Sequence, residues 1–221
     1  MGLLFFFLLA GGICATYILI VRRRRKIRRR HALEQPFLDE WVKILKNSLP
    51  PYANLSDAFR RELHDNIKLF LLEKTFEGCG GLTITDEIRV TIAAQACMLL
   101  LNRKDDCYPK LRSVLVYPST YVAGGNRLFG GKSNERSVRL GESWGHGVVV
   151  LAWDSVKQGA INFKDGHNVA IHEFAHQLDQ EDGAADGAPI LGDRTAYTSW
   201  AKIFSQEFIR LQKKKKAQCV Q

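Results

Sequence analysis

The apolar residues of this chain follow helical spacing in five stretches, recurring there every three or four positions. The stretches are residues 37–45, 57–76, 85–99, 167–180 and 194–211. The first is followed by Pro50 and Pro51, which cannot continue a helix, and Ser56 stands where the second needs an N-cap. The pattern therefore predicts five helices, each with a buried face.

Two shorter stretches, residues 111–117 and 147–153, are apolar and rich in β-branched residues, and turn-forming residues flank both. This composition is typical of buried strands. Between them, the glycine-rich residues 123–132 predict a loop. Helices grouped around a small sheet make the predicted fold class α+β.

The N-terminal part of the chain has a different pattern. Its first 21 residues contain no charged side chain, and about 20 apolar residues span a bilayer. Eight of the nine residues 22–30 are then arginine or lysine, whereas a cleaved signal peptide has its basic residues before the apolar run. By the positive-inside rule, we expect a single-pass protein of the inner (cytoplasmic) membrane with its catalytic domain in the cytoplasm. The predicted organisation is a transmembrane anchor at residues 1–21, a basic juxtamembrane segment at 22–35 and one folded domain at 36–221.

The net charge of +9 is concentrated in two basic runs. Without the eight cations of residues 22–30, 24 lysines and arginines face 23 aspartates and glutamates, and without residues 213–216 the ratio becomes 20 to 23. The folded part is therefore not basic, which argues against a nucleic-acid partner. A juxtamembrane module that binds lipid or nucleic acid remains as a further alternative, supported only by the two basic runs. The five cysteines contain no Cys-x-x-Cys pair and are expected to be reduced thiols.

His172, Glu173 and His176 form a His-Glu-x-x-His motif inside the predicted helix at 167–180. Residues four apart lie one helical turn above each other, so both imidazoles can face one metal ion. Zn²⁺ suits neutral imidazoles, and a catalytic zinc needs three protein ligands and a fourth position for water. Glu173 can take a proton from that water, as the general base of peptide-bond hydrolysis. The competing interpretation is three ordinary polar residues at a helix edge.

Neighbouring residues give weaker expectations. Asp179 is either a carboxylate that orients a ligand histidine or an exposed helix-end residue. His167 lies off the face of His172 and is expected in the helix cap, whereas His146 is a candidate for the substrate site or for a turn. The strand near residues 148–153 is either an edge that an extended substrate joins by strand addition or a central core strand.

A series of longer blocks extends over residues 37–211, namely FLLEKTFEGCGGLTITDE, IAAQACMLLL, VLVYPSTYV, GESWGHGVVVLAWDSV and NVAIHEFAHQLDQEDG. These blocks resemble the MtfA-type (Mlc titration factor A, glucose-regulated) zinc metallopeptidases. The HEFAHQLD segment is also similar to the corresponding helix of the anthrax lethal factor catalytic domain, which the family is similar to in fold. Such a series is more specific than the five-residue motif alone.

The resemblance implies an α+β zincin-like domain, Zn²⁺ held by His172 and His176, Glu173 as general base, and peptidase or aminopeptidase activity on a peptide or protein substrate. The family's third zinc ligand is a glutamate in an Asn-Pro-Ala-Glu-like stretch well downstream of the motif, and no residue here matches it. Glu207 precedes that position and is not assigned. The domain at 36–221 is therefore expected to lack its C-terminal part. The alternative function is a catalytically incomplete zincin-like domain that binds a regulatory protein, such as a transcriptional regulator.

Overall fold

The computed structural model of the chain describes residues 2–103, 107–119, 121–123, 137–139, 141–144, 147–163, 165–183, 187–191 and 193–218. The chain forms two compact units, Met1–Gln177 and Leu178–Gln221. Unit 1 contains, in order, α1 (Gly2–Glu34), α2 (Asp39–Ser48), the 3-10 helix η1 (Pro50–Asn54), α3 (Asp57–Glu73), β1 (Thr75–Gly78), α4 (Asp86–Met98), β2 (Ser113–Tyr117), β3 (Tyr121–Ala123), β4 (Ser137–Arg139), β5 (Gly141–Trp144), β6 (Val148–Ala152), α5 (Trp153–Ile161) and the larger part of α6 (Val169–Asp179).

Four strands of unit 1 form one mixed sheet in the order β1-β2-β6-β5. Strands β1, β2 and β6 run parallel, with Ser113 opposite Val148 and Tyr117 opposite Ala152, and β5 is antiparallel to β6. Because β6 is hydrogen-bonded on both sides, it offers no edge for an added substrate strand. The strand predicted near residues 148–153 is therefore a central core strand. Strands β3 and β4 pair with each other in a separate antiparallel ladder.

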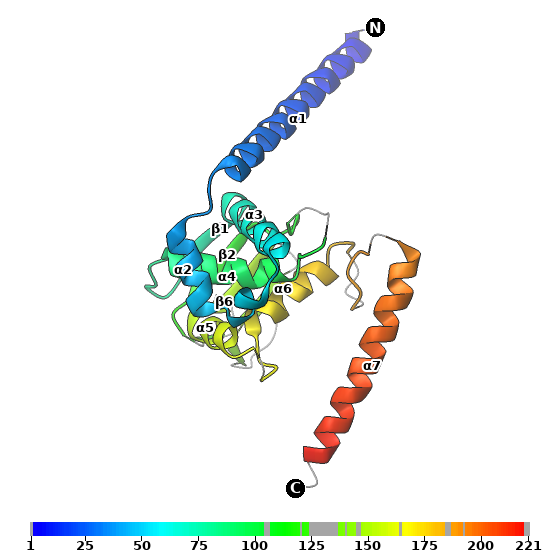
Figure 1. Ribbon diagram of the computed structural model, residues 1–221. Helices are drawn as coiled ribbons and strands as arrows, with labels where there is room; N and C mark the ends of the chain where they lie inside the picture. Colours follow the sequence, from blue (N-terminus) through cyan, green and yellow to red (C-terminus); the bar gives the residue numbers. More distant parts are fainter. Residues whose placement is uncertain are drawn as a thin grey trace. The chain divides into compact units, whose positions relative to one another are not determined.

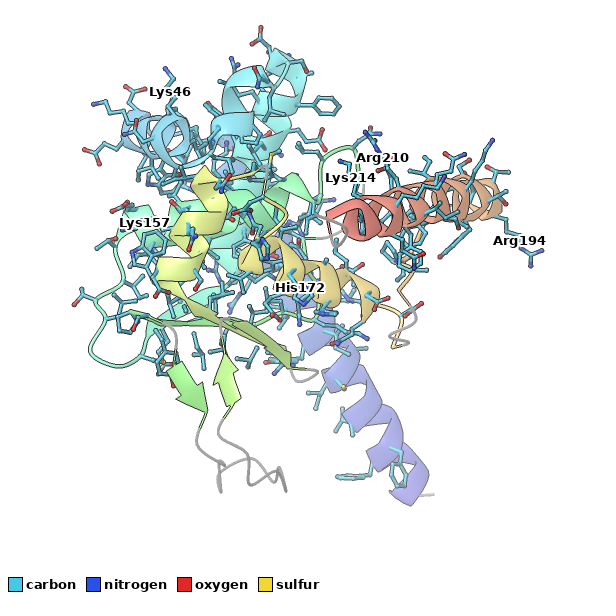
Figure 2. The ribbon with its side chains drawn as sticks, turned by 90° about the horizontal axis from the view of Figure 1, so that it is seen from below. Lys46, Lys157, His172, Arg194, Arg210 and Lys214 are labelled. Atoms are coloured by element: carbon cyan, nitrogen blue, oxygen red, sulfur yellow. The ribbon has the colours of Figure 1, made fainter. Side chains whose placement is uncertain are left out.

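Helix α4 lies among the other helices of unit 1, in contact with α2, α3 and α5 (Figure 1). Its N-cap is Thr85, whose Oγ1 accepts from Ile88 N at 3.3 Å. Side chains on nearly all faces of α4 are buried, as the alanine-rich sequence of this segment predicts. By contrast, lysines of the outer helices, such as Lys46 of α2 and Lys157 of α5, point away from the packed side chains (Figure 2).

An aromatic cluster joins α3, β1, α6 and the segment before β2. Phe70 packs on Phe76 and Tyr108, with ring centroids 6.1 and 6.0 Å away. Phe174 of α6 completes the cluster, 5.7 Å from Phe70 and 5.3 Å from Tyr108. Burial of such rings contributes a large share of core stability, so the helix with the His-Glu-x-x-His motif is anchored in the core of unit 1.

The five predicted helices are all present, with shifted ends. The second begins after its N-cap Ser56, which accepts from Phe59 N at 3.3 Å, but it ends at Glu73, and residues 75–78 form β1. The apolar spacing continues through Phe76 because this ring enters the same core from a strand. Helix α5 is an element that the sequence pattern did not reveal, since it follows β6 without an intervening turn.

The predicted location in the inner membrane is wrong. Within the described part of the chain, no helix combines the length and the apolar character that crossing a bilayer requires. Helix α1 runs on from the apolar residues into the arginine run and ends at Glu34. In α1 the apolar residues and the cations of residues 22–30 belong to one continuous helix, which is therefore not apolar along its length.

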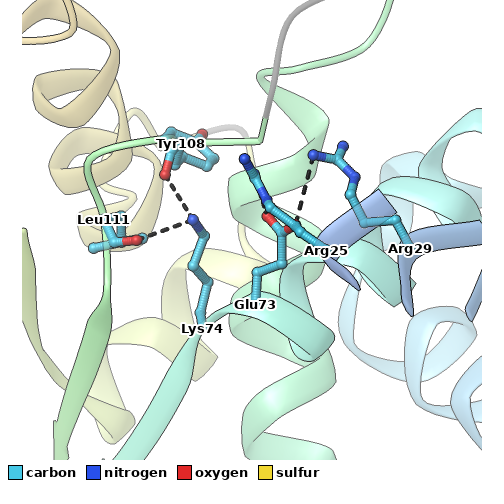
Figure 3. Close-up of polar contacts among 6 residues, drawn as sticks. All are labelled: Arg25, Arg29, Glu73, Lys74, Tyr108 and Leu111. Atoms are coloured by element: carbon cyan, nitrogen blue, oxygen red, sulfur yellow. Dashed lines mark hydrogen bonds and ion pairs between the residues drawn. The ribbon is translucent and has the colours of Figure 1, made fainter. Parts of the chain in front are cut away.

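Part of the basic run contacts the fold (Figure 3). Arg25 donates to both oxygens of Glu73, Nε to Oε1 at 3.0 Å and Nη2 to Oε2 at 3.1 Å, and Arg29 Nη1 lies 3.5 Å from Oε1. Further along α3, Lys68 Nζ donates to the carbonyl oxygens of Leu33 and Gln35 at 2.9 and 3.1 Å. Helix α1 is therefore attached to α3 by side chains of α3, and two of the arginines belong to this attachment.

Unit 2 contains the end of α6 and helix α7 (Arg194–Gln218). Asp193 caps α7, because its Oδ1 accepts from Ala196 N at 2.8 Å and from Thr195 Oγ1 at 2.5 Å. These bonds favour the ionised carboxylate, chiefly the one from the Thr195 hydroxyl, and they lower the pKa of Asp193. Within α7, Trp200 and Phe204 stack at a centroid distance of 3.8 Å.

Candidate metal centre

The start of α6 is fixed by a contact with α5. Asn168 precedes the helix, and its Oδ1 accepts from Ile171 N at 2.9 Å, as an N-cap does. The Nδ2 of the same side chain donates to Gly159 O in α5 at 2.9 Å. A Cβ at position 159 would lie 3.0 Å from Asn168 Cα and 3.1 Å from His167 O, so the close approach of α5 to the start of α6 favours glycine.

His172 and His176 lie one turn apart on the exposed side of α6 (Figure 2 labels His172). Their Nε2 atoms are 3.2 Å apart, and their rings meet edge to face with centroids 4.6 Å apart and an angle of 83°. The two nitrogens therefore converge on one point at the helix surface. The structure brings these two predicted site residues together.

The positions of α6 beside and behind the two imidazoles are buried. Phe174 is fully buried, and Glu173 and Gln177 are each 6% exposed. The motif thus separates into a solvent-facing pair of imidazoles and a shielded carboxylate. Glu173 follows His172 directly, so the carboxylate and the imidazole pair belong to one helical turn.

The spacing of the imidazoles can be tested against the geometry of a metal ion. Two Zn–N bonds of about 2.0–2.1 Å at a tetrahedral angle place the nitrogens roughly 3.4 Å apart. The 3.2 Å between the Nε2 atoms is close to this value. Two neutral nitrogen donors with that spacing fit a zinc-type ion. In the described part of the chain, no group of three or more His, Cys, Asp or Glu side chains converges on one point, so this part supplies two ligands.

The remaining sequence candidates lie elsewhere. Asp179 Oδ1 accepts from Gly187 N at 2.7 Å, so this carboxylate bonds a backbone amide beyond the helix. His167 lies in the turn before α6, with Nδ1 3.0 Å from Asp165 O. Glu207 is exposed on α7, 3.5 Å from Arg210. His146 and most of the glycine-rich residues 123–132 lie outside the described residues.

Sequence reasoning missed the residues that hold α6 in place. Asn168 could have been found, because an asparagine just before an apolar helix is a recognised N-cap. Lys74 and Tyr108 gave no comparable pattern, since a lone lysine after a helix is most often exposed. In the structure both are buried: Tyr108 belongs to the aromatic cluster that contains Phe174, and Lys74 donates to the carbonyl oxygen of Tyr108.

Comparison with known proteins agrees with this arrangement. The model of the glucose-regulated metallo-peptidase M90 family matches residues 22–220. An uncharacterized protein of Synechocystis sp. is 42% identical over 187 residues, covering 83% of this chain and 68% of that protein. Mlc titration factor A of Klebsiella pneumoniae strain 342 is 31% identical over 154 residues, covering 68% and 57%, and that of Serratia proteamaculans is 27% identical over 164 residues, covering 73% and 61%.

The chain therefore spans about two thirds of the Synechocystis relative and less than two thirds of these Mlc titration factors. An α+β unit with a small sheet and a His-Glu-x-x-His helix fits the zincin-like fold that the sequence blocks implied, and the family implies a metal cofactor. The resemblance to the MtfA-type peptidases is confirmed: the chain belongs to the family of glucose-regulated metallo-peptidases M90.

Proposed function

We propose that this protein is a zinc-dependent peptidase in which His172 and His176 bind the ion through Nε2 and Glu173 is the general base. The observation that carries the proposal is the 3.2 Å spacing of the two Nε2 atoms on the exposed face of α6. The family match supports the reaction class, because it covers the whole of α6. The peptidase domain is taken as residues 36–221.

Each residue has a separate task in this mechanism. The imidazoles would bind the ion as neutral ligands through Nε2, and α6 presents both rings to solvent on one face. When bound, Zn²⁺ lowers the pKa of a water molecule and polarises the scissile carbonyl. Glu173 accepts the proton of that water on its carboxylate and passes it to the leaving amine. Its burial limits competition from bulk water for this carboxylate.

A second function rests on a different observation. The described residues supply only two ligands, and two histidines alone hold zinc weakly. The relatives named Mlc titration factor A bear a name that refers to Mlc rather than to hydrolysis. The alternative is therefore a zincin-like domain that binds a regulatory protein partner without cleaving it.

The test measures zinc content by elemental analysis and hydrolysis of a peptide library with the full chain. We expect His172→Ala to lose zinc and hydrolysis together. Glu173→Gln should keep zinc and lose hydrolysis by about 10²–10⁴-fold, the usual contribution of a general base. His167→Ala is the matched control, an exposed histidine just outside the helix that should change neither quantity.

The outcomes separate the two functions. Zinc binding without hydrolysis in the wild-type chain would favour the regulatory binding domain. A wild-type chain that binds no zinc, or a Glu173→Gln variant as active as wild type, would overturn the peptidase proposal.

A further inference from the structure

A buried lysine stands at the junction of α3 and β1. Lys74 is only 7% exposed, although lysine is rarely buried without partners. Its Nζ donates to Tyr108 O at 2.6 Å and to Leu111 O at 3.0 Å (Figure 3). The ammonium group thus joins the end of α3 to the segment that leads into β2.

Tyr108 has an unusual backbone conformation, with φ of +48°. Side chains other than glycine, asparagine and aspartate rarely adopt this left-handed region, so it persists only where surrounding contacts impose it. Two contacts do so here, the Lys74 ammonium on the carbonyl oxygen and a hydrogen bond of 2.7 Å from the phenol to Ala96 O of α4. Tyr108 is thereby held both at its backbone carbonyl and at its phenol hydroxyl.

The fixed ring lies against α6. Its centroid is 5.3 Å from that of Phe174, which is fully buried and shares a helical turn with both His172 and His176. Phe70 contacts both rings, at 6.0 Å from Tyr108 and 5.7 Å from Phe174. The rotation of α6 about its own axis therefore depends on where the Tyr108 ring lies. That rotation sets the direction in which the imidazoles point.

We infer that Lys74 and Tyr108 are positioning residues of the metal centre, which act through Phe174 to hold the His172–His176 pair at its ligand spacing. The inference rests on the proposed zinc function for its purpose. The contacts that join Lys74, Tyr108 and Phe174, here called the clamp, exist in the metal-free chain. It explains why a lysine is buried and a tyrosine held in the left-handed region beside this helix. Neither residue takes part in the reaction itself.

The test uses three variants of the full chain. Lys74→Met removes the ammonium at similar length, and Tyr108→Phe keeps the ring and removes only the bond to Ala96 O, so it serves if Lys74→Met does not fold. Leu45→Ala is the matched control, because Leu45 is fully buried on α2 and is not part of the aromatic cluster. It destabilises the core without touching the clamp.

Two measurements follow α6 directly. In the metal-free proteins, hydrogen exchange of the α6 amides should become about tenfold faster in Lys74→Met relative to the amides of α2, and exchange in Leu45→Ala should show no such bias toward α6. With Co²⁺ as the probe, Lys74→Met should bind about 10–100-fold more weakly and show an altered visible absorption spectrum, as expected when a support of a ligand is lost. Tyr108→Phe should show both effects to a smaller extent.

Two results would overturn the inference: α6 exchange in Lys74→Met that rises no more than that of α2, or Co²⁺ affinity and spectrum equal to those of wild type. A wild-type chain that binds no Co²⁺ or Zn²⁺ would overturn the proposed function instead. The hydrogen-exchange comparison still decides the clamp in that case.

Discussion

Histidines occupy two contrasting environments in unit 1. His172 and His176 lie exposed on α6 with their Nε2 atoms facing each other, 3.2 Å apart. His64 of α3 is stacked on Phe37, with centroids 3.8 Å apart and ring planes inclined by 6°, and its Nε2 lies 2.8 Å from the Tyr52 hydroxyl.

The difference shows what makes a histidine available to a metal ion. The Nε2 of His64 is already bonded to a neighbouring hydroxyl, and Phe37 stacks on its ring, so this side chain serves packing. The pair on α6 has solvent on its open side, and among the described residues the polar and ring contacts of each imidazole are with the other imidazole. Residue type is the same in both places, and tertiary contacts decide the role.

The largest expected effect is the loss of zinc-dependent stabilisation. At a zinc concentration about 100 times its Kd, binding to the folded state adds roughly 2.7 kcal/mol to the free energy of unfolding. We expect this increase in the wild-type chain and in His64→Ala, and none in His176→Ala. Differential scanning calorimetry with and without zinc measures it. An equal increase in His176→Ala would remove the distinction between the two environments.

His64→Ala should lower the free energy of unfolding by about 2 kcal/mol, because it removes a stacked ring and leaves the Tyr52 hydroxyl without its partner. His167→Ala, an exposed histidine in a turn, should stay within about 0.5 kcal/mol of wild type. Urea denaturation of both variants provides the comparison. Similar losses in the two would mean that the contacts of His64 contribute little.

Gly159→Ala should cost about 1–2 kcal/mol, since the added Cβ would crowd Asn168 where α5 meets the start of α6. The exposed neighbour Gln158→Ala on the same helix is the control, with an expected change below about 0.5 kcal/mol. Chemical denaturation measures both. Should Gly159→Ala be as stable as wild type, the contact between these helices would be looser than its distances indicate.

The smallest expected effect is a pH dependence of stability from His64. Burial lowers the pKa of His64, with smaller contributions from Arg60 and Lys68, while Asp65 acts in the opposite direction. As the pH decreases, the unfolded chain therefore binds the proton first, near pH 6.5. The free energy of unfolding falls from that pH downward and levels off once the pH is below the folded-state pKa.

His64→Gln cannot titrate but keeps an acceptor for the Tyr52 hydroxyl. We expect urea denaturation between pH 8 and pH 5 to show a smaller loss of stability in this variant than in wild type. Parallel curves for the two proteins would assign the pH dependence to other groups.

Much of the arrangement could be anticipated from the sequence. Ser56 is an N-cap where the sequence suggested it, and the apolar residues of α3 and α4 are buried as their spacing predicts. The His-Glu-x-x-His motif placed two imidazoles on one helical face because four residues make about one turn. These predictions succeeded because they depend on contacts between residues close in sequence.

The structure decided the points that depend on distant residues. The strand at residues 75–78 exists because Thr75 pairs with Ser113, and β6 is central because β2 and β5 flank it. The location predicted from the apolar N-terminus was wrong, and Arg25 and Arg29 instead contact Glu73 of α3. None of these contacts between distant residues produces a periodic pattern in the sequence.

The sequence by itself determined the family, five of the helices and the pair of imidazoles, because these follow from local spacing and from blocks of matching residues. Only the tertiary structure decided which histidines are open to a metal ion, and that Lys74, Tyr108 and Phe174 meet behind α6. The physical reason is that burial and side-chain contacts between separate elements are set by how the elements pack, whereas periodicity records only which face of each element is buried.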